Sequence, residues 1–314
     1  MIPPLPNLYI PGAPKCGTSA LASYLDSRPD TALGRIKEPN FWSNDLPSFA
    51  IREGLETELQ YRSIFSDDCS LRYRLDASTH YLFSEVATAR IVDAVPDARF
   101  IVCIRSQVEI AHAWHMQMCN AGYETEPDFE TAWNLIPERR EGHRVPDRCP
   151  EPRLLDYKGV ASVGHQIERL LTQVDRSAVH FLRLASLKCD ARNEYLAVLE
   201  FLDLEDDGRT EFASSNAAHT NRSATLSHLV RHPRIRPWLN RSLGRLGGRT
   251  EKQLKRIAKR FLYRTAPRRA LSPVLANTLR NTFAEDDRIL ETILGQGLLD
   301  CTDGSVSATL TIAN

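Results

Sequence analysis

A glycine-rich turn between a strand-like run and a helix-like run constrains the fold of this chain more than any other feature. The stretch LYIPGAPKCGTSALASYL, residues 8–25, starts with β-prone residues, passes through a turn that contains Gly12, Lys15 and Gly17, and ends in an Ala- and Leu-rich segment. In such a geometry backbone N–H groups and the helix dipole converge on an anion. The stretch therefore predicts a phosphate-binding turn at the start of a helix.

This turn differs from the loop of magnesium-dependent nucleotide hydrolases. That loop reads G-x-x-x-x-G-K-[ST], whereas here Lys15 precedes Gly17 and Cys16 separates the two. The hydrolases also hold Mg²⁺ with an acidic residue at the end of a neighbouring strand, but the apolar strand expected at 98–106 carries Arg105 at that point. A guanidinium binds phosphate directly, so the sequence predicts a phosphate-bearing ligand and no metal.

Strand-like and helix-like runs alternate along the rest of the chain. Strands are expected at residues 8–10, 72–76, 98–106 and 178–184, and helices at residues 19–25, 86–94, 110–118, 164–172, 193–202 and 274–298. This alternation predicts an α/β fold, a single P-loop-like domain whose central parallel sheet is flanked by helices on both faces.

Composition and cysteine usage indicate the cellular compartment and the kinds of partner that are expected. The longest apolar runs fall well short of the roughly 20 residues that a membrane helix needs, so no membrane span is expected. The seven cysteines are scattered and form no C-x-x-C pair, which favours the cytoplasm over a disulfide framework or a zinc site. Forty basic and forty acidic residues cancel, so the overall charge indicates no polyanionic partner.

Several motifs, in this order, resemble those of a known enzyme family. They are PGAPKCGTSAL, SRPD followed by KEPNFW, DASTHYLF, RFIVCIRSQVEIAHAWH and VHFLRLASLKCDARNEYLAVLEFLDL. The set is similar to that of sulfotransferases that use 3′-phosphoadenosine 5′-phosphosulfate (PAPS), in particular the bacterial and heparan-sulfate-type members, and it spans about residues 8–300. The resemblance implies a sulfotransferase domain over residues 1–300, with a C-terminal tail at 301–314.

The resemblance also implies roles for individual residues. Glu38 of KEPNFW matches the general base that takes the acceptor proton, although it can also be read as a loop acid paired with Lys37 or Arg35. Lys15 matches the lysine that stabilises the leaving phosphate. His80 would orient the acceptor or the sulfuryl oxygens, and a structural role for it is an equal alternative.

The remaining implied residues bind the two phosphate ends of PAPS. Arg105 maps onto the arginine for the 3′-phosphate, and Arg222, in a loop that resembles the one closing over the nucleotide, is a second cation for it. The position of a usual serine contact holds Ala113, which has no hydroxyl to donate to that phosphate. The 5′-phosphosulfate loop comprises Gly12, Ala13, Pro14, Lys15, Cys16, Gly17, Thr18 and Ser19.

Two regions are expected to serve the acceptor side or to act as a lid, namely residues 122–153 and 225–270. The second contains the basic segment, residues 231–269, with eleven arginines, three lysines and a single acid. Arginine-rich surfaces can bind nucleic acid, but an acceptor-side role or a solvated helix face is favoured, and no nucleic-acid partner is expected. Trp42, Tyr81, Trp114 and His115 can line an acceptor pocket or pack in the core.

The implied reaction moves a sulfuryl group from PAPS to a hydroxyl of a carbohydrate, lipid or small-molecule acceptor and leaves adenosine 3′,5′-bisphosphate (PAP). Two alternatives stay open. A P-loop kinase would show Mg²⁺ dependence and ATP hydrolysis. A nucleotide- or nucleic-acid-binding protein without turnover would bind DNA with a steep salt dependence and would not bind PAP.

Overall fold

The structure is a computed structural model that describes residues 3–46, 54–212, 219–221, 263–265 and 270–295. The described residues fall into two compact units. Unit 1 holds the described parts of Met1–Ser106, Ser162–Phe212 and Asn281–Asn314, and unit 2 holds those of Gln107–Ala161 and Ala213–Arg280. The predicted boundary after residue 300 lies outside the described residues.

Unit 1 is built on a parallel sheet of five strands in the order β2-β3-β1-β4-β5. The strands are β1 (Leu8–Tyr9), β2 (Thr31–Leu33), β3 (Tyr73–Asp76), β4 (Arg99–Ile104) and β5 (Val179–Arg183). The central strands β1, β3 and β4 are almost entirely buried, as expected for a parallel sheet covered on both faces.

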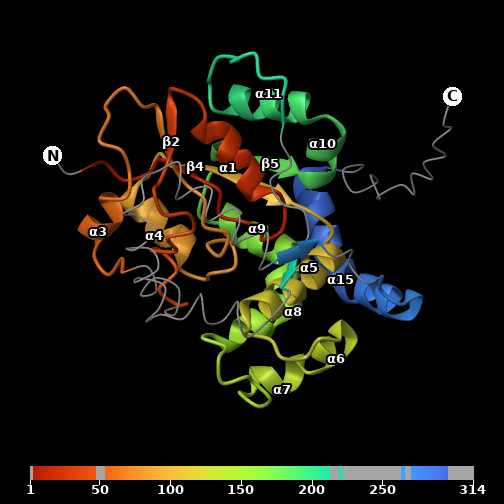
Figure 1. Ribbon diagram of the computed structural model, residues 1–314. Coiled ribbons are helices and arrows are strands. Elements are labelled where there is room, and N and C mark those ends of the chain that lie inside the picture. Colours follow the sequence, from red (N-terminus) through yellow and green to blue (C-terminus); the bar gives the residue numbers. More distant parts are fainter. Residues whose placement is uncertain (1–2, 47–53, 213–218, 222–262, 266–269, 296–314) are drawn as a thin grey trace, which may run out of the picture. The chain divides into compact units, whose positions relative to one another are not determined.

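The helices of unit 1 surround this sheet (Figure 1). Their bounds are α1 (Thr18–Asp26), α3 (Glu58–Arg62), α4 (Ala87–Ala94), α9 (Val163–Leu171), α10 (Leu184–Cys189), α11 (Ala191–Phe201) and α15 (Pro273–Leu294), the last of which begins in unit 2. The connection from β1 to β2 and the connection from β3 to β4 run in opposite directions across the sheet. Because parallel crossovers are right-handed, α1 lies on one face and α4 on the other.

Unit 2 is mostly helical in its described part. Its elements are α5 (Gln107–Ala121), α6 (Phe129–Asn134), α7 (Ile136–Arg140), α8 (Tyr157–Ala161) and a small antiparallel pair, β6 (His219–Asn221) with β7 (Tyr263–Thr265). A buried ion pair stabilises this unit, because Arg139 donates to Glu124 at 2.6 and 2.9 Å and both side chains are almost fully buried. The predicted excursion at 122–153 thus contains ordered helices.

The predicted fold class is confirmed, and each predicted strand and helix has a counterpart within a few residues. The sequence prediction missed β2, β6, β7, α3, α8 and α10, all of which are six residues or shorter. The closing segment is one continuous helix, α15, that ends at Leu294. Of the basic segment, residues 231–262 and 266–269 lie outside the described residues.

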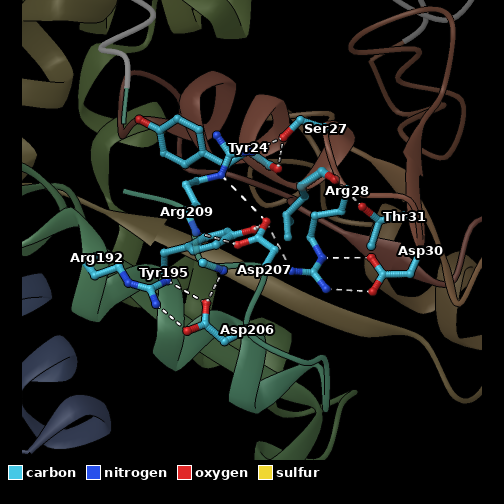
Figure 2. A network of polar contacts seen from close by, with 12 residues as sticks. Tyr24, Ser27, Arg28, Asp30, Thr31, Arg192, Tyr195, Asp206, Asp207 and Arg209 are labelled. Carbon is cyan, nitrogen blue, oxygen red and sulfur yellow. Dashed lines mark hydrogen bonds and ion pairs between the residues drawn. The ribbon is translucent and has the colours of Figure 1, made fainter. Parts of the chain in front are cut away.

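A short segment, residues 203–212, ties α1 to α11 and is called the strap (Figure 2). Asp207 of the strap accepts from the Tyr195 hydroxyl at 2.9 Å and pairs with Arg28 at 3.4 Å. Arg28 also donates twice to Asp30, at 2.8 and 2.7 Å. The guanidinium of Arg209 lies over the rings of Tyr24 and Tyr195. The strap therefore joins the C-terminal end of α1 to α11 by charged groups and rings.

Candidate active site

The glycine turn lies at the carboxyl end of β1, beside β3, and the connections that leave these two neighbouring strands run in opposite directions across the sheet. Open α/β sheets bind ligands at such a switch point. The turn is bonded to β4, because Ala13 donates its backbone N–H to the Cys103 carbonyl and Cys103 donates back to the Gly12 carbonyl, both at 2.8 Å. A side chain at Gly12 would place its Cβ 2.8 Å from that of Leu82. Glycine is thus required by the close approach of two loops.

Helix α1 begins directly after this turn without a side-chain cap. Its N-cap residue is Gly17, in the left-handed region with φ 89°, and glycine has no side chain with which to cap the helix. The positive end of the helix dipole faces the turn, and the first turn of α1 contains no acidic residue. An anion fits such a helix start.

Two cationic residues meet at the turn. Lys15 is half-buried and left-handed, with φ 66°. Arg105 follows the last residue of β4, and its Nη1 donates to the carbonyl oxygen of Lys15 at 3.4 Å. The structure thus brings the predicted turn residues, which are contiguous in the chain, together with Arg105. Arg222, predicted as a second cation, lies outside the described residues.

The loop after β3 packs against the same turn. Leu82 donates its backbone N–H to the Pro11 carbonyl at 2.8 Å. His80 belongs to this loop and is 7% exposed. Its carbonyl oxygen accepts from the backbone N–H of Ser84 at 2.8 Å. The DASTHYLF segment therefore lies next to the glycine turn, as a shared site requires.

Glu38 lies on a third segment, the KEPNFW stretch, residues 37–42. Its carboxylate Oε1 accepts from Lys37 Nζ at 2.8 Å, and the side chain of Glu38 is 35% exposed. The structure therefore contains the ion pair that was the alternative interpretation of this residue. Glu38 and Asn40 both have left-handed backbones, with φ 58° and 52°.

Beside these predicted residues lies a buried carboxylate that the sequence analysis did not single out, Asp76 at the end of β3. It is 1% exposed and accepts from the hydroxyls of Tyr61, Ser78 and Tyr81 at 2.6, 2.6 and 2.9 Å. Burial raises the pKa of Asp76 to about 6, and the charge of Glu38 adds to this rise. Its signal in the sequence is an acidic residue at the end of the strand predicted at 72–76. In the sheet this strand lies next to the strand of the glycine turn.

The four aromatic or imidazole candidates for an acceptor pocket are all buried. Trp42 donates its indole N–H to the Tyr61 hydroxyl, and Trp114 donates its own to the Leu154 carbonyl. Tyr81 donates to Asp76, and the ring nitrogen Nε2 of His115 lies 2.8 Å from the Glu126 carbonyl oxygen. These contacts favour core packing. His115 also lines a cavity of about 450 Å³ in unit 2, together with His112, Cys119 and Asp128.

The comparisons with known proteins give a clear result for the fold. No protein-family model matches the sequence, and no curated protein matches it. Among solved structures, the crystal structure of a sulfotransferase from Alicyclobacillus acidocaldarius is similar, with 24% identity, 92% of this chain and 96% of that chain covered, and a TM-score of 0.64.

Two further structures align less closely. A sulfotransferase domain from the curacin biosynthetic pathway is 12% identical over 93% of this chain and 98% of that one, with a TM-score of 0.42. The sulfotransferase domain of the Synechococcus PCC 7002 olefin synthase is 14% identical over 66% and 76%, with a TM-score of 0.37. Neither carries weight at these scores. The Alicyclobacillus acidocaldarius structure thus confirms the resemblance seen in the motifs as a shared fold.

Proposed function

We propose that this chain, which has the fold of a sulfotransferase, transfers a sulfuryl group from PAPS to the hydroxyl of a carbohydrate, lipid or small-molecule acceptor. One observation carries the proposal. Lys15 and Arg105 meet at an uncapped helix start, at the switch point of the sheet. Cations at a helix N-terminus are the groups that bind a phosphate-bearing nucleotide.

The residues at the turn fit a ligand with two anionic ends. The start of α1 offers backbone N–H groups and the positive end of its dipole to the 5′-phosphosulfate. The guanidinium of Arg105 suits the 3′-phosphate, because its planar donors match phosphate oxygens. When bound, PAPS supplies the sulfuryl group, and the phosphate that carried it is the leaving group.

Each functional residue then has a defined task in an in-line displacement. Glu38 takes the acceptor proton as the new oxygen–sulfur bond forms. Lys15 neutralises the charge that develops on the phosphate oxygen as the old sulfur–oxygen bond breaks. The products are a sulfate ester and PAP, and the proton leaves Glu38 to solvent. His80 orients the acceptor or the sulfuryl oxygens from the loop beside the turn.

Three further predictions, two on phosphate contacts and one on location, are part of the proposal. Arg222 would add a second cation for the 3′-phosphate, and Ala113 would leave that phosphate without a hydroxyl contact from α5. The third is a cytoplasmic location. For the part of the chain that the structure describes, no helix is both long enough and apolar enough to cross a membrane.

Calorimetry with PAP, ADP and ATP, each with and without Mg²⁺, tests the proposal. We expect PAP to bind at least about tenfold more tightly than ADP or ATP, a difference of about 1.4 kcal/mol, and to need no Mg²⁺. Lys15→Ala should weaken PAP binding, whereas Lys188→Ala, an exposed lysine of α10, should not. Binding of ATP that requires Mg²⁺, without binding of PAP, would instead support a kinase.

A further inference from the structure

The buried carboxylate of Asp76 lies at the end of β3, beside the strand that leads into the glycine turn. Asp76 is the last residue of β3 and is paired in register with Tyr9 of β1. Its carbonyl oxygen accepts from the backbone N–H of Ile10, the residue that enters the glycine turn, at 2.9 Å. Its position is therefore fixed by the two strands from which the site loops depart.

Among the described residues, each of the three hydroxyls that donate to Asp76 also accepts a hydrogen bond from the KEPNFW segment. Ser78 Oγ accepts from the Asn40 backbone N–H at 3.1 Å. The Tyr61 hydroxyl accepts from the Trp42 indole at 3.1 Å, and the Tyr81 hydroxyl accepts from the Trp42 backbone N–H at 3.5 Å. One carboxylate thus orients three hydroxyls whose oxygens face the same short segment. Linked hydrogen bonds of this kind strengthen one another in a low-dielectric interior.

This segment carries Glu38 in a backbone conformation that its sequence does not favour. Glu38 precedes Pro39, and residues before proline prefer extended backbone, yet Glu38 is left-handed. The side-chain amide of Asn40 donates to the Glu38 carbonyl oxygen at 2.8 Å. Left-handed non-glycine residues persist only where surrounding contacts hold them. Arg90 also holds this segment, because its Nη1 donates to the Trp42 carbonyl oxygen at 2.9 Å. The contact nearest to Glu38 that leads to the core runs through Asn40 to Ser78 and Asp76.

Burying a carboxylate in a core to bind three hydroxyls costs free energy. A neutral group of similar size would avoid the cost of burying a charge. Among the described residues, the groups that donate to Asp76 are these hydroxyls, and no basic side chain forms an ion pair with it. A neutral side chain, however, could not accept from all three donors at once as a carboxylate does.

We propose that Asp76 is a positioning residue for the catalytic base, because it holds Asn40 and Trp42 through Ser78, Tyr61 and Tyr81 and so fixes the place of Glu38. The proposal rests on the proposed function, since it assumes that Glu38 is the base. It assigns Asp76 no contact with substrate. The hydroxyl of Ser78 is the most direct link, because it connects the carboxylate to the backbone of Asn40.

The first test measures the link itself. Ser78→Ala removes the acceptor of the Asn40 N–H, so hydrogen exchange in a peptide that covers residues 36–43 should become at least about tenfold faster. Ser78→Thr keeps the hydroxyl and should restore slow exchange. Ser84→Ala is the matched control, because Ser84 is a buried serine that donates to Asp45 at 2.5 Å. It should leave this peptide unchanged. Unchanged exchange in Ser78→Ala would overturn the proposal.

The second test measures the consequence for turnover, as PAP released from PAPS with water or a probe alcohol as acceptor. Ser78→Ala should lower kcat about tenfold or more while the PAP dissociation constant stays within about twofold. In a Glu38→Gln background the same substitution should have no further effect, because a residue that acts through Glu38 has nothing left to position. A fall in kcat that is equal in both backgrounds would contradict the proposal.

The two tests separate failure of this inference from failure of the proposed function. If the unaltered chain neither binds PAP nor turns over PAPS, the proposed function is wrong and the positioning role fails with it. If the chain binds PAP and turns over PAPS but Ser78→Ala has the kcat of Ser84→Ala, only the positioning role is wrong.

Discussion

Arg105 occupies the position that distinguishes the proposed ligand from ordinary nucleotides. Its Nη1 donates to the Lys15 carbonyl oxygen at 3.4 Å, which places the guanidinium at the glycine turn. We expect Arg105→Ala to weaken PAP binding about 10- to 100-fold, because a charge-assisted hydrogen bond contributes about 1.5–3 kcal/mol. Binding of adenosine 5′-phosphosulfate, which has no 3′-phosphate, should change much less. Calorimetry with both ligands measures the difference.

Arg105→Lys is the informative companion to this variant. It keeps the charge and loses the planar fork, so PAP binding should recover only in part. Equal losses for PAP and for the ligand without a 3′-phosphate would contradict the role given to Arg105.

Asp76 predicts a pH dependence of stability with a definite sign. Burial raises its pKa from 3.8 to about 6, so the folded chain binds this proton more tightly than the unfolded chain. The stabilisation is complete below the unfolded pKa and is lost as the pH rises through about 6. Between about pH 4.5 and about pH 7 the loss amounts to about 2 kcal/mol.

Chemical denaturation of the unaltered chain and of Asp76→Asn measures this loss. Asparagine does not titrate, so the cost of the substitution should be larger near pH 4.5 than near pH 7, by about 2 kcal/mol. Tyr9, Tyr61 and Tyr81 surround the carboxyl, but burial raises their pKa values well above 10, so they do not titrate in this window. A cost that is independent of pH would be inconsistent with a raised pKa.

At the residue scale, the sequence identified groups that are close in the chain or lie at strand ends. Lys15 could be predicted because the turn that carries it is local, and Arg105 because it follows an apolar run. The hydroxyl network around Asp76 could not be predicted in full. It joins Tyr61 of α3 to Ser78 and Tyr81 of the loop after β3, and only the folded chain sets such contacts.

At the scale of elements, burial explains which predictions succeeded. The strand predicted at 98–106 became β4, because a continuous β-branched and apolar run is typical of a strand buried on both faces. The three-residue β2 (Thr31–Leu33) has no such run, and its pairing with β3 defines it. A signal for α3 was present, since Thr57 and Gln60 form a capping box.

The strap offers an element-scale test of how charged pairs stabilise the contact between α1 and α11. The side chain of Arg28 is 3% exposed and pairs with both Asp30 and Asp207. We expect Arg28→Ala to lower the free energy of unfolding by about 2 kcal/mol, because two carboxylates lose a buried partner. Urea denaturation measures this change.

Arg192→Ala is the matched control for the strap. Arg192 also pairs with a strap carboxylate, Asp206, but that side chain is 45% exposed. Exposed ion pairs contribute little, so this variant should unfold close to the unaltered chain. If the two arginine variants lost equal stability, burial would not be what distinguishes the two pairs.

At the scale of the whole molecule, segments far apart in the sequence complete unit 1. The strand order places β1 between β3 and β4, so the candidate site combines a turn near residue 15, a loop near residue 80 and the end of a strand near residue 104. The alternation of strands and helices predicted this kind of sheet, but it could not give the strand order, because no local pattern encodes which strands pair.

The last described helix, α15, also packs in unit 1. It supplies an N-terminal cap for α9, whose own N-cap residue provides none. The N-cap residue of α9, Ser162, makes no side-chain cap. Asp286 of α15 accepts instead from the backbone N–H groups of Gly164 and His165, both at 2.9 Å, and it lies 2.6 Å from His165 Nδ1. A contact that spans more than a hundred residues thus satisfies the start of a core helix.

Asp286→Ala should therefore lower the free energy of unfolding by about 1–2 kcal/mol, the usual cost of losing an N-cap acceptor, or more because the freed N–H group of Gly164 is buried. Glu285→Ala, which removes an exposed carboxylate one residue earlier on the same helix, should have little effect. Urea denaturation of both variants measures the contrast. Asp286→Asn keeps an acceptor oxygen and should recover part of the loss. If Asp286→Ala unfolded like Glu285→Ala, α15 would close unit 1 through its apolar residues alone, Phe283 and Leu290 foremost.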